Sequence, residues 1–374
     1  MDVRRRFLLF SFLGLLLLLP VVSTAGDKDK GKVSQSNLKP LDIVFCLDLS
    51  GSTNGLLNDL RDHLWMIINQ ANNMEPKPAL RMGVVGFSRP SFGKENAYVK
   101  VLVPLTSNFD FLAEELYKLK PSIEKGDQIV AAALRASVND MHWSERTDAV
   151  KLVFLVGNGM VSGTDHEYVR FCEQAREKNI VVHPIYVMKS ANWFKELPGW
   201  RRIATMTGGM QTEVTINKPD NMQVFVSVKK DLTELNNRIN ATYNWAGVDS
   251  SVCRRSLIAA DSGAMYADNI DVFLNRLYYK SGEEYASVFA DCDLVSNAVM
   301  MREGVAAEET DGAFRMRLME MYQARELLRS QLRREFSKAD LDAMQKAYTS
   351  ESIENAGVLR RCILNILFKA WGMH

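Results

Sequence analysis

One stretch decides the fold that this sequence is expected to form: Lys39-Pro-Leu-Asp-Ile-Val-Phe-Cys-Leu-Asp-Leu-Ser-Gly-Ser-Thr53. Its short apolar run, Leu41 to Leu47, is typical of a buried strand, and the amphipathic segment after it predicts a helix. The strand would bring Asp48, Ser50 and Ser52 to its carboxyl end, where open α/β sheets bind ligands. One carboxylate and two hydroxyls within five residues suit a hard cation such as Mg²⁺. The alternative is that these residues only form a turn and cap the helix.

Strands and helices are predicted to alternate from Leu41 to about Asn240. Strands are expected at 41–47, 79–87, 98–105, 151–156, 180–187 and 211–214, and helices at 56–68, 109–119, 128–141, 166–178, 200–206 and 222–239. This alternation predicts a doubly wound α/β fold, with a mainly parallel six-stranded sheet flanked by helices. Right-handed crossovers would place the carboxyl ends of the parallel strands at one edge.

Two further loops are expected at the same edge as Asp48. One loop, 124–128, contains Asp127 and precedes a helix, and the other contains Asn158 directly after the strand 151–156. The surface around them would include Thr53, Asn54, Arg89, Pro90 and Met160.

The pattern Asp48-x-Ser50-x-Ser52 resembles the metal-ion-dependent adhesion site (MIDAS) of the von Willebrand factor type A (vWA) domain, a Rossmann-like α/β fold. The sequence is similar to a bacterial exported subgroup of this family. The further segments that match this subgroup are Val103 to Ser107, Gly126-Asp127, Leu152 to Gly157 and Ala204 to Gly209. The resemblance implies that Asp48, Ser50 and Ser52 bind Mg²⁺, or Mn²⁺ or Ca²⁺, directly. Asp127 and Asn158 would lie in the first or second coordination shell, and an acidic side chain of a protein partner would complete the site.

The predicted site departs from the family pattern at Asn158, where an aspartate is expected. Asn keeps a carbonyl oxygen but removes one charge, and a charge 4 to 5 Å from a divalent ion is worth on the order of 1 to 4 kcal/mol. Metal affinity would therefore fall by about tenfold or more. The alternative is a degenerate site on a metal-free vWA scaffold, in which Asp48 caps backbone donors and partners bind other surfaces.

The chain begins with a predicted signal peptide at 1–25. Three arginines precede the apolar run from Phe7 to Leu19, and small residues lead to a cleavage site after Ala25. An uncleaved anchor is the alternative, although the apolar run is short for a membrane span. We expect a secreted, periplasmic or cell-surface protein that is not inserted in a membrane after cleavage, with a flexible leader at 26–40.

The charge balance gives no reason to expect a nucleic-acid partner. Removal of residues 1–25 takes away three Arg and one Asp, so Lys+Arg falls from 46 to 43 and Asp+Glu from 45 to 44, a net charge of −1. Five cysteines remain. Cys46 and Cys172 are expected to be buried thiols, whereas an exported chain could form a disulfide among Cys253, Cys292 and Cys362.

The second half of the chain is predicted to be an α-helical domain, 241–374, following a vWA domain at 41–240. Helices are expected at 268–280, 282–301, 312–336, 338–348 and 352–371. The arginines Arg315, Arg325, Arg329, Arg333 and Arg334 are expected largely on the faces of their helix turned away from its apolar side.

The histidines are scattered, and no nucleophile elbow, phosphate loop or dinucleotide motif is visible. The sequence therefore predicts a non-enzymatic binding or adhesion protein. A hydrolase hidden in the helical half is the remaining alternative from another functional class.

Overall fold

The computed structural model describes residues 38–120, 129–161, 167–215, 226–267, 270–282, 284–285, 288–300, 312–338 and 358–373. Leu38 and the residues after it form one compact unit. The predicted helix 338–348 after its first residue, the signal peptide and the leader up to 37 lie outside the described residues. The predicted domain boundary between residues 240 and 241 stays a prediction.

The sheet confirms the predicted fold class. Its strands are β1 (Lys39–Asp48), β2 (Pro78–Phe87), β3 (Lys100–Thr106), β4 (Val150–Gly157), β5 (Ile180–Val187) and β6 (Thr212–Val214). They follow the order β3-β2-β1-β4-β5-β6, and only the pairing of β2 with β3 is antiparallel among the described strands. The chain therefore changes direction across the sheet between β1 and β4, the place where doubly wound folds bind ligands.

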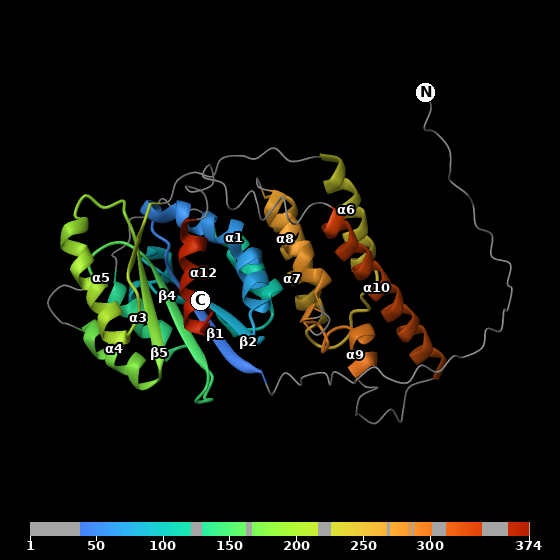
Figure 1. The fold of residues 1–374 in the computed structure, drawn as a ribbon, viewed down its shortest axis with the longest axis horizontal. Helices are drawn as coiled ribbons and strands as arrows, with labels where there is room; N and C mark the ends of the chain where they lie inside the picture. Colours follow the sequence, from blue (N-terminus) through green and yellow to red (C-terminus); the bar gives the residue numbers. More distant parts are fainter. Residues whose placement is uncertain are drawn as a thin grey trace. The chain divides into compact units, whose positions relative to one another are not determined.

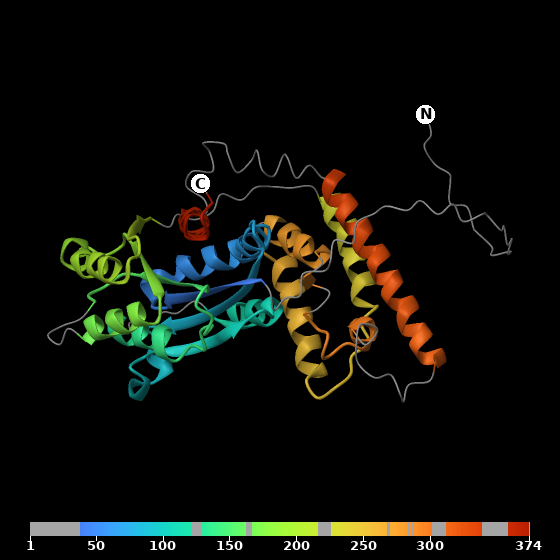
Figure 2. The same ribbon diagram turned by 60° about the horizontal axis from the view of Figure 1, so that its bottom comes forward.

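Two hydrophobic cores cover the two faces of this sheet. In β1, Ile43, Phe45 and Leu47 belong to the first core, whereas Val44 and Cys46 belong to the second, as alternation along a strand requires. The first core is closed by α1 (Asn54–Asn72), α2 (Phe109–Lys118) and α12 (Val358–Trp371), and the second by α3 (Val130–Asn139), α4 (Glu167–Glu177) and α5 (Trp193–Thr207). Figures 1 and 2 show α1 and α12 on one side of the sheet and α3 and α4 on the other.

The prediction that Cys46 and Cys172 are buried thiols is confirmed, and both lie in the second core. Cys46 and Cys172 are both inaccessible, and burial raises the pKa of each to about 12. Cys253 and Cys292 form a disulfide, and Cys362 is a free, half-buried thiol.

The remaining helices are α6 (Val226–Asn240), α7 (Ser250–Met265), α8 (Ile270–Ser281), α9 (Leu294–Met300) and α10 (Gly312–Lys338). Helix α7 packs on α2 and α8 packs on α1, while α10 contacts α6, α8 and α9. The side of the sheet near β4 and β6 is covered by α12, from the far end of the sequence. None of the helices that the structure describes is both long and apolar enough to cross a lipid bilayer.

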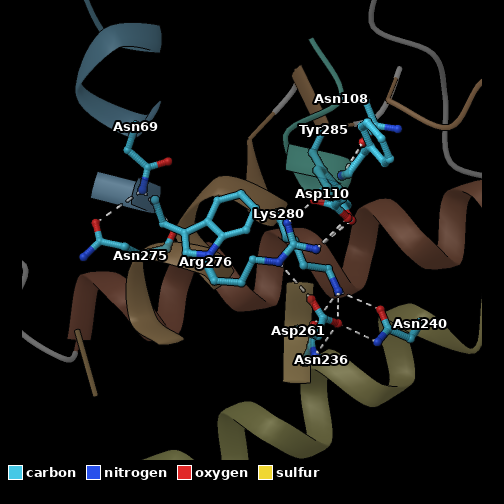
Figure 3. A network of polar contacts seen from close by, with 12 residues as sticks. Asn69, Asn108, Asp110, Asn236, Asn240, Asp261, Asn275, Arg276, Lys280 and Tyr285 are labelled. Atoms are coloured by element: carbon cyan, nitrogen blue, oxygen red, sulfur yellow. Dashed lines mark hydrogen bonds and ion pairs between the residues drawn. The ribbon is translucent and has the colours of Figure 1, made fainter. Parts of the chain in front are cut away.

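A buried network of charges joins α2 to α6, α7 and α8 (Figure 3). Arg276 donates to both carboxylate oxygens of Asp110, at 2.5 and 2.8 Å, and to Asp261 at 2.9 Å. Lys280 donates to Asp261 at 2.8 Å and also to the amide oxygens of Asn236 and Asn240. Two acids and two bases thus neutralise one another with little contact with water.

A second titratable group lies where α12 crosses α1. Asp59 has a carboxylate oxygen, Oδ2, that is buried without a hydrogen-bond partner, and its other oxygen lies 3.5 Å from His63 Nδ1. Burial and the neighbouring Asp62 raise the pKa of Asp59 to about 7, against the opposing effect of Arg360 on α12. Burial and Arg360 lower the pKa of His63 to about 4.

Replacing Asp59 by asparagine is expected to make the fold more stable at pH 8 and to leave it nearly unchanged at pH 4. The native carboxyl binds its proton more tightly than the unfolded one, so Asp59 lowers the free energy of unfolding as pH rises from about 4 through 7. Urea unfolding of both proteins at pH 4, 6 and 8 should show the difference growing to about 1–3 kcal/mol. Glu234→Gln, at an exposed position of α6, is the control. A variant less stable than the wild type at pH 8 would contradict the assignment.

Candidate functional site

The predicted site begins at Asp48, the last residue of β1. Its side chain is completely buried at the carboxyl edge of the sheet. The backbone N–H of Ser50 donates to Oδ1 at 2.9 Å, and the backbone N–H of Asn158, after β4, donates to the same carboxylate. Asp48 therefore joins the loop after β1 to the loop after β4.

The end of β4 reaches Asp48 because Gly157 has no side chain. A Cβ at residue 157 would lie 2.5 Å from the Cβ of Asp48, which is closer than carbon atoms can approach. Glycine at this position thus brings Asn158 against the carboxylate. Asn158 is itself buried, as expected for a residue at the switch point between β1 and β4.

The turn after Asp48 is held by hydroxyl groups. Thr53 donates from Oγ1 to the carbonyl oxygen of Asp48 at 2.7 Å and to that of Ser50 at 3.0 Å. The two hydroxyl oxygens of Ser50 and Thr53 are 3.5 Å apart, and both residues are buried. The prediction that Thr53 belongs to the surface around the site is therefore wrong, because its hydroxyl closes the turn.

The electrostatics of Asp48 reflect two opposing effects. Burial raises the pKa of its carboxyl, while hydrogen bonds from the backbone and side chain of Ser50 and from the backbone of Asn158 lower it. Burial prevails, and the pKa lies above its usual value. A nearby cation would favour the charged form of this carboxyl.

The structure brings together three of the five predicted metal ligands: Asp48, Ser50 and Asn158. Asp127 lies outside the described residues, and for Ser52 only the backbone is described, within a 3₁₀ turn at Gly51–Thr53. Carboxylate, hydroxyl and amide side chains fit a hard divalent cation in kind. Among the residues that the structure describes, however, no three His, Cys, Asp or Glu side chains gather at a common point. The described donors therefore fit a weakly charged site, with Asp48 as its anion.

Two residues that support this edge of the sheet were missed by sequence reasoning. Glu196 in α5 accepts hydrogen bonds from the backbone N–H of Gly159 and the hydroxyl of Tyr186, both at 2.6 Å. Trp200 donates from Nε1 to the carbonyl oxygen of Gly159 at 2.8 Å. Together they fix the loop that carries Asn158. In the structure α5 begins before Pro198 and places Glu196 and Trp200 on one buried face. The predicted helix began only at Trp200 and therefore left Glu196 out.

The strand order and the helices on both faces define a doubly wound α/β domain, with polar residues at the switch point between β1 and β4, where folds of this class bind ligands. Residues 42–226 match the von Willebrand factor type A domain, and this part of the chain is a domain of that family. The helices that follow belong to the same chain and pack against the domain.

Several solved structures resemble the chain. One is a von Willebrand factor type A protein from Catenulispora acidiphila, with 13% sequence identity and a TM-score of 0.36, covering 61% of this chain and 43% of that one. The pilus adhesin SpaC from Lactobacillus rhamnosus GG has 15% identity and a TM-score of 0.37, covering 48% and 28%. The manganese-loaded TRAP protein of Plasmodium vivax has 17% identity and a TM-score of 0.31, covering 46% and 72%. This chain thus spans less than half of the Catenulispora protein. No curated protein sequence matches it.

Proposed function

We propose that the chain is an exported, non-enzymatic binding protein that recognises a protein partner at the carboxyl edge of its sheet, with a divalent cation held there. The observation that carries this proposal is the meeting of Asp48, Ser50 and Asn158 at the β1–β4 switch point. Type A domains are commonly interaction modules. The scattered histidines, which form no catalytic motif in the sequence, agree with a binding role. The Cys253–Cys292 disulfide supports export to an oxidising compartment.

The ligands proposed for the cation are Asp48, Ser50, Ser52, Asp127 and Asn158. Mg²⁺ or Mn²⁺ bound by so few charges would keep several water molecules, and an acidic side chain of the partner would replace one of them. The cation would supply positive charge at this edge, while the backbone donors of Ser50 and Asn158 would hold Asp48 in place.

A metal-free scaffold is the second candidate, and one observation favours it. Asp48 already accepts hydrogen bonds from the backbone of two loops and from the hydroxyl of Ser50, so its carboxyl oxygens have partners without a cation. In that case the edge would be rigid but would carry no metal, and partners would bind elsewhere on the domain.

Titration with Mg²⁺ and Mn²⁺ by calorimetry separates the two candidates. For a metal site we expect saturable binding by the exported chain, its loss in Asp48→Asn, and at least about tenfold tighter binding in Asn158→Asp, which adds a carboxylate beside Asp48. Asp148→Asn, at an exposed position, is the control variant. If the wild type and Asn158→Asp both fail to bind below millimolar concentrations, the scaffold is the correct assignment.

A further inference from the structure

Three large apolar side chains are exposed beyond the carboxyl ends of β4 and β5. They are Met160, 51% exposed, Trp193, 45% exposed, and Phe194, 56% exposed. We call them the apolar ridge. Single exposed apolar residues are common on protein surfaces, but exposed aromatic side chains in contact with one another, tryptophan among them, are typical of binding sites.

The backbone that carries the apolar ridge is held in place by hydrogen bonds to α5. Met160 follows Gly159, whose N–H and carbonyl are bound by Glu196 and Trp200 of α5. Trp193 begins the same helix, one turn before Glu196. The rings of Trp193 and Phe194 meet edge to face, with centroids 6.2 Å apart. Little backbone conformational entropy would be lost when a partner contacts these side chains, because their backbone is already fixed.

The charges beside the ridge are positive. Lys189 and Lys195 are exposed, and Lys195 Nζ lies 5.6 Å from the ring of Phe194. Glu196, the acid nearest in sequence, is buried and accepts three hydrogen bonds, the third from Ser190. Within the described residues, neither lysine forms an ion pair with an acid. The surface therefore combines apolar contact area with unpaired positive charge.

We infer that the apolar ridge docks an acidic segment of another protein, which places a large apolar side chain against Met160, Trp193 and Phe194 and carboxylates against Lys189 and Lys195. Aromatic anchors in such a surface carry most of the binding energy, and the flanking charges steer the encounter. The inference rests on the proposed role of this edge in protein recognition. It does not depend on the cation, because none of the ridge residues is a proposed ligand.

Selection from a random peptide display library on the exported chain tests this assignment, with Mg²⁺ present and with a chelator. We expect selected peptides to combine Asp or Glu with an aromatic or Leu residue. Trp193→Ser and Phe194→Ser should each weaken their binding at least about tenfold. Lys189→Glu with Lys195→Glu should weaken it as well and reduce its dependence on salt. Ile258→Ser, at an exposed position of α7, and Tyr266→Ser, at the exposed residue that follows this helix, are the matched controls.

The remaining outcomes overturn the inference. Peptides without acidic residues, or peptides that bind the Trp193→Ser and control variants equally, would place recognition elsewhere. Ridge-dependent sedimentation with phosphatidylglycerol-containing vesicles, without peptide enrichment, would make the ridge a membrane contact. Ridge-dependent dimerisation in analytical ultracentrifugation, again without enrichment, would make it a contact between copies. Ridge-dependent peptide binding that persists in the chelator, with no calorimetric metal binding, would keep the inference and remove the cation from the proposed function.

Discussion

Replacing Arg276 by methionine is expected to destabilise the folded chain by about 3–5 kcal/mol. The guanidinium of Arg276 is fully buried and is the cation that contacts both Asp110 and Asp261. It also lies 4.5 Å from the centre of the Trp65 ring. Methionine fills part of the space but leaves two buried carboxylates with Lys280 as their remaining described cationic neighbour. Removing one partner from a buried ion pair costs more than the pair contributes, because the other charge stays buried.

Urea unfolding at pH 7, followed by circular dichroism, measures this effect. Arg146→Met is the matched control, since Arg146 pairs with Asp148 at the surface and its loss should cost no more than about 1 kcal/mol. The double variant Asp110→Asn with Arg276→Met should recover part of the stability lost in Arg276→Met. Asp110 is the more completely buried of the two acids in the network, and this variant removes its charge. Equal stabilities of Arg276→Met and Arg146→Met would mean that the network contributes nothing.

Replacing Trp200 by alanine is also expected to lower the free energy of unfolding by about 3–5 kcal/mol. Trp200 is completely buried in the second core, and its ring packs edge to face on Tyr186 with centroids 5.6 Å apart. The substitution leaves a cavity and removes the hydrogen bond to the carbonyl of Gly159. The loop carrying Asn158 should therefore loosen, so any binding at this edge should weaken together with stability.

Trp193→Ala provides the matched control on the same helix. Trp193 is nearly half exposed, so its replacement should change the free energy of unfolding by no more than about 0.5 kcal/mol. Thermal unfolding of Trp200→Ala and Trp193→Ala compares the contributions of the two tryptophans to stability. Similar losses for both would mean that Trp193 is part of the core and not of the apolar ridge.

The strands were predictable because β1, β4 and β5 are short apolar runs, as expected for strands buried on both faces. Helix α7 was not predicted. Its buried side includes Ser256 and Asp261, which hydrogen-bond to Glu114 and Arg276, beside the apolar residues Cys253, Leu257, Ala260 and Ala264. These apolar residues follow helical spacing, but polar residues lie among them and two of the four are alanines, so the apolar face of this helix is hard to detect in the sequence.

The predicted helix 282–301 is wrong over its first part, because α9 begins only at Leu294. The carboxylate of Asp293 accepts from the backbone N–H of Ser296 at 3.0 Å and from that of Asn244 at 2.8 Å. Asp293 thus caps the new helix and ties it to a distant segment, an interaction that a single-sequence pattern does not contain.

The prediction for the arginines of α10 fails at Arg325 and Arg329. Both are buried: Arg325 donates to Asp293 at 2.7 Å, and Arg329 to the carbonyl oxygen of Lys280 at 3.1 Å. Their partners come from segments whose positions the sequence pattern does not give. For the candidate site, the sequence located Asp48 and Asn158 through the strands that precede them. It could not reveal Glu196, which acts through a tertiary contact with the loop of Gly159.

Helix α12 limits how early during synthesis the chain can finish folding. It contributes Leu359, Ile363 and Ile366 to the first core, and its Trp371 lies against Lys39 at the very start of β1. During synthesis the sheet strands emerge long before the helix that covers them near β4 and β6. Until Trp371 has been made, apolar surface on that side stays uncovered, which delays closure of the first core. Folding to the final state is thus tied to the last residues of the helix, so a nascent chain released early would keep this surface open to chaperones.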